Sequence, residues 1–217
     1  MLDPKQITAV ILAGGEGRRM KKADKGLITL WGKPLIAHLL ARLTPQVANV
    51  IINANRNQAL YQQYAPVITD RVTDSLTGFA GPLAGFEAGL RHALSEWVLF
   101  VPCDSPLVPA DLAERLCGAV THAGQIAIVD DGIHLHAATA LLHRSLLPSL
   151  QHYLAVGDRK LQLWFAQHEL LKVDFSDQVA AFTNLNTPEA LAQLEQEQPK
   201  DHFATESAKP TENSNKA

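Results

Sequence analysis

The sequence predicts an α/β protein built on a mostly parallel, doubly wound sheet with helices on both faces. Two observations predict this fold class. Short runs of β-branched and other apolar residues alternate with stretches of helical period along the chain. These runs are apolar throughout instead of alternating with polar residues, as strands covered on both faces are. With 217 residues, 47% of them hydrophobic and 19% charged, the chain is long and apolar enough for one sizeable core.

The first strand is expected at 7–12, a run that contains no charged residue. Further short apolar runs, bounded by Gly, Asn, Asp or Pro, predict strands at 50–52, 67–68, 97–101 and 126–129. Helices are expected between the strands at about 34–43, 57–64, 82–94 and 109–121. The last two begin at Pro82 and Pro109, because proline is tolerated in the first turn of a helix.

The second part of the chain is less regular. A strand is expected at 136–142, helices at 146–155 and 159–167, and a further strand at 170–174. A closing helix begins where Thr187 can serve as the N-cap and Pro188 as the first helical residue. After about residue 196 the sequence is polar, with Phe203 as its only large apolar residue, and cannot bury enough surface to fold. We therefore expect a single domain over 1–196 and a disordered tail over 197–217.

Charge and cysteine content exclude several classes of function. The 19 basic and 22 acidic residues give a net charge of −3, so nucleic acid is not expected as the main partner. Two cysteines, Cys103 and Cys117, are too few for a disulfide framework or a structural zinc site, and they indicate a reducing compartment. The chain shows neither a secretory leader nor an apolar run of about 20 residues that could span a bilayer. We expect a cytoplasmic protein with no membrane partner.

A glycine-rich loop follows the first predicted strand, where ligands of doubly wound sheets bind. The loop contains Gly14 and Gly15 and runs into a dense basic stretch. Glycines let backbone N–H groups approach an anion closely, and the basic residues supply positive charge that is locally unbalanced. These basic residues are Arg18, Arg19, Lys21, Lys22 and Lys25. The loop suits a triphosphate, with a tight turn followed by a solvated basic face as the alternative.

This loop matches neither of two common phosphate-binding motifs. The pattern G-x-x-x-x-G-K-[ST] does not occur, and the glycines from Gly14 fit G-x-G-x-x-G poorly because position 19 is Arg. Switch GTPases and ordinary dinucleotide dehydrogenases are therefore disfavoured.

Asp104 follows the fourth predicted strand and stands between Pro102 and Pro106. A carboxylate at a strand end that faces a polyphosphate is well placed to hold Mg²⁺, which takes one or two carboxylates plus phosphate oxygens. A turn residue or a helix cap is the alternative role for Asp104. Cys103 is disfavoured as a nucleophile, because it adjoins an apolar strand and has no evident basic partner.

Polar residues at two further places in the chain could read a base or a ribose through hydrogen bonds. Asn53 and Asn55 follow the second predicted strand, and Asp74 precedes the helix that begins at Pro82. Small residues from Gly81 to Gly85 leave room for a flat ring. Turn chemistry explains Asn53 or Asp74 equally well at this stage.

Together these segments resemble the molybdenum cofactor guanylyltransferases, nucleotidyltransferases with a Rossmann-like, three-layer αβα fold. The resemblance covers about residues 7–195. Its landmarks are Leu12-Ala13-Gly14-Gly15, Arg19-Met20, Asp24-Lys25, Gly81-Pro82-Leu83-Ala84-Gly85, Pro102-Cys103-Asp104 and Asn184-Leu185-Asn186-Thr187-Pro188-Glu189. Each landmark is weak alone, but six in this order are specific.

The resemblance implies an enzyme that uses Mg²⁺, with GTP and molybdenum-loaded molybdopterin as substrates. The terminal phosphate of molybdopterin would attack the α-phosphate of GTP, giving molybdopterin guanine dinucleotide and pyrophosphate. The implied GTP-binding residues are Leu12, Ala13, Gly14, Gly15, Lys25, Asn53, Asp74 and Asp104. The implied catalytic residues are Arg19, Lys25 and Asp104, with Asp104 as the metal ligand. Asn184 and Asn186 would lie near the reacting phosphates or the pterin.

Two positions depart from the pattern of this family. Lys21 follows the Arg-Met pair where the family usually has Gly, and Ala137 follows His136 where a His-Pro step is common. The pair His134 and His136 could also suggest a metal site, but without a clear third ligand two such histidines are more often ordinary surface or partly buried residues.

Two other functions compete with this interpretation. The first is a CTP-dependent transferase that acts on molybdopterin or on a small alcohol phosphate, although such relatives generally read Ala-Ala-Gly at Leu12-Ala13-Gly14. The second is a catalytically silent carrier of nucleotide or cofactor, which could dispense with a metal carboxylate such as Asp104. Transient contacts with cofactor-insertion proteins or apo-molybdoenzymes are compatible with either role, and we expect a monomer.

Overall fold

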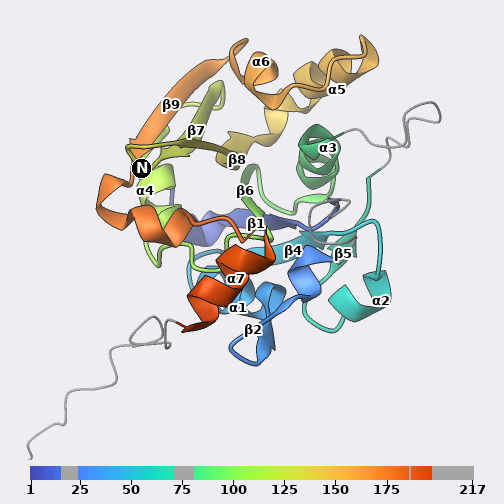
Figure 1. The fold of residues 1–217 in the computed structure, drawn as a ribbon. Helices are drawn as coiled ribbons and strands as arrows, with labels where there is room; N and C mark the ends of the chain where they lie inside the picture. Colours follow the sequence, from blue (N-terminus) through green and yellow to red (C-terminus); the bar gives the residue numbers. More distant parts are fainter. Residues whose placement is uncertain (16–23, 71–80, 186, 197–217) are drawn as a thin grey trace, which may run out of the picture.

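A seven-stranded sheet forms the centre of the computed structural model, which describes residues 1–15, 24–70, 81–185 and 187–196 (Figure 1). The strands lie in the order β5-β4-β1-β6-β8-β7-β9. Their bounds are β1 Ile7–Leu12, β4 Asn49–Asn53, β5 Val67–Ile68, β6 Trp97–Pro102, β7 Gln125–Asp130, β8 Leu135–His143 and β9 Glu169–Asp174. A separate two-stranded sheet pairs β2, Thr29–Leu30, with β3, Lys33–Pro34.

Strand direction determines which loops meet at one edge of the sheet. The neighbours β5, β4, β1 and β6 are parallel, so their carboxyl ends lie together. In the register, Leu12 of β1 stands between Asn53 of β4 and Pro102 of β6. Strand β8 is antiparallel to both β6 and β7, and β9 is again parallel to β7. The prediction of a mostly parallel sheet is confirmed.

Helices cover both faces of the sheet and complete the three layers (Figure 1). One core cluster joins the sheet to α1, Leu35–Leu43, and α4, Leu112–Ala119. The other joins it to α3, Pro82–His92, α5, Leu147–Ala155, and α6, Leu161–Phe165. Along β1, Ile7, Ala9 and Ile11 enter the first cluster and Val10 enters the second, because successive side chains of a strand point to opposite faces.

A third, smaller cluster anchors the last helix. Leu30 and Leu35 pack with Leu185, and α7, Pro188–Gln196, adds Leu191 and Leu194. Thr187 caps α7 as expected, since its Oγ1 accepts a hydrogen bond of 3.2 Å from the Ala190 N–H.

Two expected helices differ from the structure. The helix expected at 109–121 begins at Leu112, so Pro109 is not in its first turn. Instead the Pro109 carbonyl accepts a 2.9 Å hydrogen bond from the Gln46 amide, whose oxygen accepts another from the Ala113 N–H. The helix expected at 57–64 is shorter in the structure, where α2 spans Gln58–Tyr61. It cannot begin at Asn57, because that residue has a left-handed backbone with φ of 50°.

Short elements were absent from the expectations. They are the β2–β3 pair and four 3₁₀ segments: η1 Pro4–Gln6, η3 Lys25–Leu27, η4 Arg144–Leu146 and η5 Ser176–Phe182. Within the described ranges, none of the helices has the length and hydrophobicity to cross a bilayer.

Candidate active site

The loop after β1 is fixed between the ends of its two neighbouring strands. The Ala13 N–H donates a 2.8 Å hydrogen bond to the Asn53 carbonyl, and the Cys103 N–H donates one of 3.1 Å to the Leu12 carbonyl. These bonds continue the parallel ladder beyond the strand ends and bring Gly14 and Gly15 to the carboxyl edge. The structure therefore places the expected nucleotide loop where a doubly wound sheet binds ligands.

Lys25 and Asp104 meet at this edge although they are 79 residues apart in sequence. The Lys25 Nζ lies 2.9 Å from Asp104 Oδ2, and the two side chains are 23% and 14% exposed. Both groups are thus shielded but reachable from solvent. A cation beside a carboxylate at a strand end is suited to hold a phosphate chain with its metal ion.

The donor set at Asp104 fits Mg²⁺ better than a metal held by protein alone. Among the described residues, no group of three or more His, Cys, Asp or Glu side chains is arranged to hold a metal ion. Mg²⁺ needs only one or two carboxylates, because it keeps waters and takes substrate phosphate oxygens for the rest of its shell. Asp104, partly shielded and paired with Lys25, has the chemistry of such a carboxylate.

A network of amides and one carboxylate lies beside Gly14. Asn53, only 2% exposed, donates through Nδ2 to Asp70 Oδ1 at 2.8 Å. Asn55 donates to the other oxygen of Asp70 at 2.6 Å and accepts from the Asp70 N–H at 2.9 Å. The sequence places Asn55 at this strand end but gives it no role of its own, and Asp70 was missed. Asp70 stands two residues after β5, so the rule applied to the other strand ends would have found it.

Glycines bring α3 and the β1 loop against this network. A Cβ atom on Gly14 would lie 3.1 Å from the Asn55 Nδ2, and one on Gly85 would lie 2.7 Å from the Asn53 Oδ1. Gly81, just before α3, has φ of 67°, a conformation that favours glycine. The small residues therefore allow close packing around Asn53.

Asn184 lies beside Asp104 on a segment from the far end of the chain. Its Oδ1 accepts a 3.0 Å hydrogen bond from the Ser105 hydroxyl, and the Leu185 N–H donates at 2.9 Å to the Asp104 carbonyl. Expected site residues from both ends of the domain thus converge. Arg19, Asp74 and Asn186, which were expected here as well, lie outside the described residues.

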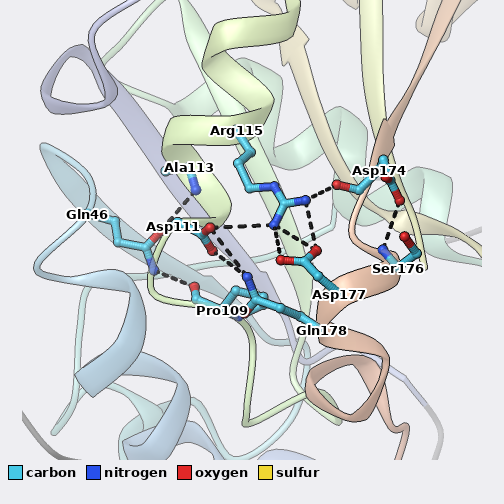
Figure 2. A network of polar contacts seen from close by, with 9 residues as sticks. All are labelled: Gln46, Pro109, Asp111, Ala113, Arg115, Asp174, Ser176, Asp177 and Gln178. Carbon is cyan, nitrogen blue, oxygen red and sulfur yellow. Dashed lines mark hydrogen bonds and ion pairs between the residues drawn. The ribbon is translucent and has the colours of Figure 1, made fainter. Parts of the chain in front are cut away.

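Polar contacts hold the segment that leads to Asn184 (Figure 2). Nη1 of Arg115, in α4, donates to both carboxylate oxygens of Asp177, each within 3.1 Å. Nη2 of the same guanidinium donates to the Asp174 carbonyl. Its guanidinium also lies 4.0 Å from the centre of the Phe175 ring. Gln178 donates to Asp111 at 3.1 Å. This cluster fastens η5, which ends two residues before Asn184, to α4.

The segment after β4 contacts both described ends of the glycine-rich loop. Arg56 donates a 3.0 Å hydrogen bond to the Gly15 carbonyl. Asn57 donates to Asp24 Oδ2 at 3.0 Å, and the Tyr61 hydroxyl donates to the other oxygen of Asp24. The sequence reasoning did not identify these three residues, because nothing in their spacing shows that they lie beside the loop.

Two further candidates have other roles in the structure. Nε2 of His136 lies 2.7 Å from Asp131 Oδ2, and its ring packs against Phe182, so this ring nitrogen is engaged within the protein. Burial, followed by the nearby carboxylates of Asp104 and Asp24, raises the pKa of the Cys103 thiol. A thiol that stays protonated is a poor nucleophile, which agrees with the sequence-based expectation.

The comparisons with known proteins point in one direction. The chain matches the model of the MobA-like NTP transferase domain over residues 9–173. It is 49% identical to the molybdenum cofactor guanylyltransferase of Vibrio cholerae over 193 residues, which cover 89% of this chain and 93% of that protein. The protein of the same name from Photobacterium profundum is 47% identical, with 90% and 99% of the two chains covered.

A solved structure agrees with these sequence matches. It is the molybdopterin-guanine dinucleotide biosynthesis protein A of Archaeoglobus fulgidus, with a TM-score of 0.71 and 25% identity. The match covers 87% of this chain and 97% of that one, so the similarity extends over the whole three-layer fold.

Proposed function

Because the chain belongs to the family of MobA-like NTP transferases, we propose that it is a molybdenum cofactor guanylyltransferase. It transfers GMP from GTP to the terminal phosphate of molybdenum-loaded molybdopterin. The products are molybdopterin guanine dinucleotide and pyrophosphate. The observation that carries this proposal in the structure is the Lys25–Asp104 pair, which stands at the carboxyl edge beside the glycine-rich loop.

On the donor side, the proposed residues form two groups. Backbone groups of Leu12, Ala13, Gly14 and Gly15 would contact the nucleotide, and Lys25 would bind its phosphates together with Arg19. Asn53 would hold the base or ribose, and its hydrogen bond to Asp70 adds that carboxylate to the proposed site. Asp74, the residue first expected in this role, stays a proposal from the sequence alone.

The reaction needs positioning and charge neutralisation more than a covalent group from the protein. An oxygen of the acceptor phosphate attacks the α-phosphorus of GTP, and a new P–O bond forms. The bond between the α-phosphorus and the bridging oxygen to the β-phosphate breaks, and pyrophosphate leaves with the electron pair. Lys25 would stabilise the negative charge on the phosphate chain. Asp104 would hold Mg²⁺, which supplies further charge neutralisation when bound.

Asn184 and Asn186 are proposed for the acceptor side. Asn184 lies beside Asp104 through Ser105, so its amide is close to the proposed position of the reacting phosphates. Amide groups can donate to phosphate oxygens or to the pterin without adding charge.

Base preference separates this function from its competitors. We expect calorimetric titration with GTP, CTP, ATP and UTP, each with Mg²⁺, to show selective binding of GTP. A preference for CTP would favour the cytidylyl transferases instead. Selective GTP binding without formation of the dinucleotide product from molybdopterin would favour the silent carrier.

Loss of the proposed metal carboxylate provides a second test. We expect Asp104→Ala to lower turnover by about a hundredfold or more, since charge neutralisation in the transition state is lost. The fold should survive, because Asp104 is a partly exposed loop residue. Equal turnover of variant and wild type at saturating Mg²⁺ would contradict the assignment.

The cellular compartment, the oligomeric state and the protein partners are also proposals. Two free cysteines, both buried, support a reducing compartment such as the cytoplasm. We propose a monomer that meets cofactor-insertion proteins or apo-molybdoenzymes transiently while handing over its product.

A further inference from the structure

Tyr61, the last residue of α2, touches the residues on both sides of Lys25. We propose that Tyr61 is a positioning residue, which aims the Lys25 ammonium at the phosphate chain of the nucleotide by holding Asp24 and Gly26. This inference rests on the proposed function, because it assumes that Lys25 binds those phosphates.

The first contact is a hydrogen bond to Asp24. The Tyr61 hydroxyl donates to Asp24 Oδ1, while Asn57 donates to Oδ2 at 3.0 Å. Both oxygens of this carboxylate are therefore held by one short segment. Hydrogen bonds to a charged oxygen are about twice as strong as neutral ones, so Asp24 is held firmly immediately before Lys25.

The second contact is steric and lies on the other side of Lys25. A Cβ atom on Gly26 would lie 2.5 Å from the Tyr61 hydroxyl oxygen and 3.0 Å from Cε1 of its ring. The ring thus lies directly against the Gly26 backbone, in space that any larger residue would fill. Tyr61 is fully buried, so its ring has little freedom to move away.

Backbone contacts carry this restraint to Lys25 itself. The Leu27 N–H donates to the Asp24 carbonyl at 3.0 Å, and the Ile28 N–H donates to the Lys25 carbonyl at 3.1 Å. These bonds form η3, a single tight turn whose first residue is Lys25. A lysine ammonium stands on a flexible stem, so the direction in which it reaches Asp104 depends on how firmly its backbone is held.

The hydroxyl keeps its proton over the working pH range. Burial, with the hydrogen bond to Asp24 as the next cause, raises the pKa of Tyr61. The group is therefore protonated and can donate the hydrogen bond to Asp24.

The test uses Tyr61→Phe, which removes the hydroxyl and keeps the ring against Gly26. Tyr64→Phe is the matched control, because Tyr64 is 41% exposed, three residues further along the same segment. With the full chain, GTP, Mg²⁺ and molybdopterin, we expect Tyr61→Phe to lower kcat/KM for GTP by about 10- to 100-fold. The control should keep the wild-type value.

A double-mutant cycle with Lys25→Ala separates positioning from a general structural effect. If Tyr61 acts through Lys25, adding Tyr61→Phe to Lys25→Ala should change kcat/KM by less than about twofold. An equal loss in both backgrounds would overturn the inference, because it would mean that Tyr61 acts on the fold and not through Lys25. Asn57→Gly, which tolerates the left-handed backbone of Asn57 and removes the other donor to Asp24, should show the same pattern.

The outcomes distinguish this inference from the proposed function. If Lys25→Ala strongly lowers kcat/KM for GTP but Tyr61→Phe matches the wild type, only the role of Tyr61 is overturned. If the wild-type protein transfers no GMP to molybdopterin, the proposed function itself fails. If Lys25→Ala retains the wild-type kcat/KM for GTP, the phosphate role of Lys25 and the inference drawn from it both fail.

Discussion

At the scale of single residues, Gly85 allows α3 to approach Asn53 and Leu12 closely, on the side where we propose that the nucleotide binds. An Ala at this position would bring its Cβ within 2.7 Å of both the Asn53 Oδ1 and the Leu12 Cδ2. Because the neighbours are a buried amide and a strand-end side chain, one of them must shift. We expect Gly85→Ala to weaken GTP binding by about tenfold and to lower stability by about 1–3 kcal/mol, as overpacking does.

Gly118→Ala is the matched control for this substitution. Gly118 is also helical, in α4, but a Cβ there would meet no atom within 4 Å. Alanine is favoured over glycine in a helix by about 0.5–1 kcal/mol, so the control should keep GTP affinity and melt at the same or a higher temperature. Calorimetric titration and thermal unfolding measure both effects. Equal GTP affinity in the two variants would contradict the packing argument around Asn53.

We expect Asp131 to make the stability of the folded protein depend on pH in the acid range. Burial raises its pKa, but hydrogen bonds from His136 and from the His134 and Ile133 N–H groups outweigh this, and the pKa falls from 3.8 to about 2. The unfolded chain therefore takes up this proton first as the pH decreases. The stabilisation is complete above the ordinary value of 3.8 and disappears as the pH falls through about 2.

Denaturant unfolding of the wild type and Asp131→Asn at a series of pH values tests this prediction. The wild type should be the more stable protein near neutral pH, and the difference should shrink between about pH 4 and pH 2. A difference that stays constant over this range would show that the charge of Asp131 contributes nothing.

At the scale of elements, the attachment of η5 to α4 depends on the shape of Arg115 and not only on its charge. The side chain contacts Asp177, the Asp174 carbonyl and the Phe175 ring, and a lysine cannot make all three contacts. We expect Arg115→Lys to lower the melting temperature by about 2–4 °C. Asp177→Asn should have a smaller effect, because the Asp177 side chain is 61% exposed and surface ion pairs contribute little. Equal decreases would mean that the ion pair alone holds η5.

The elements also show what the sequence could and could not predict. Strands such as β1 were predicted correctly because their apolar runs reflect burial on both faces, a local property. The start of α4 was predicted wrongly because the side chain that completes its first turn, Gln46, lies far away in sequence. Strand β8 runs antiparallel to β6, and the residue pattern of a strand does not indicate its direction. The direction of β8 could therefore not be predicted from the sequence.

In the candidate site, too, some residues could be identified from the sequence and others could not. Asp104 could be named as a candidate because it stands two residues after β6, and the structure pairs it with Lys25. Asp70 could have been found by the same rule, whereas Asp74 lies outside the described residues and stays a prediction. The contact of Tyr61 with Gly26 could not be predicted from the sequence, because it forms only when the chain folds.

At the scale of the whole molecule, we propose that folding requires only residues 1–196. The 21 residues from 197 to 217 have one large apolar side chain, Phe203, and little surface to bury. Deleting them should change the melting temperature by less than about 1 °C, well under the effect of one typical core substitution. Thermal unfolding of the shortened and complete chains measures this. A decrease of several degrees would mean that the final segment packs on the domain.

The central place of β1 has a consequence for how the protein is made. Among the described strands of this sheet, β1 leaves the ribosome first, yet its partners on either side are β4, Asn49–Asn53, and β6, Trp97–Pro102. At about 5–20 residues per second, synthesis needs roughly 5 to 18 seconds to proceed from the end of β1 to the end of β6. Throughout that interval this buried, largely apolar strand has no completed sheet to join. Chaperones that bind nascent chains would find in Ile7–Leu12 a segment to shield until β6 has emerged.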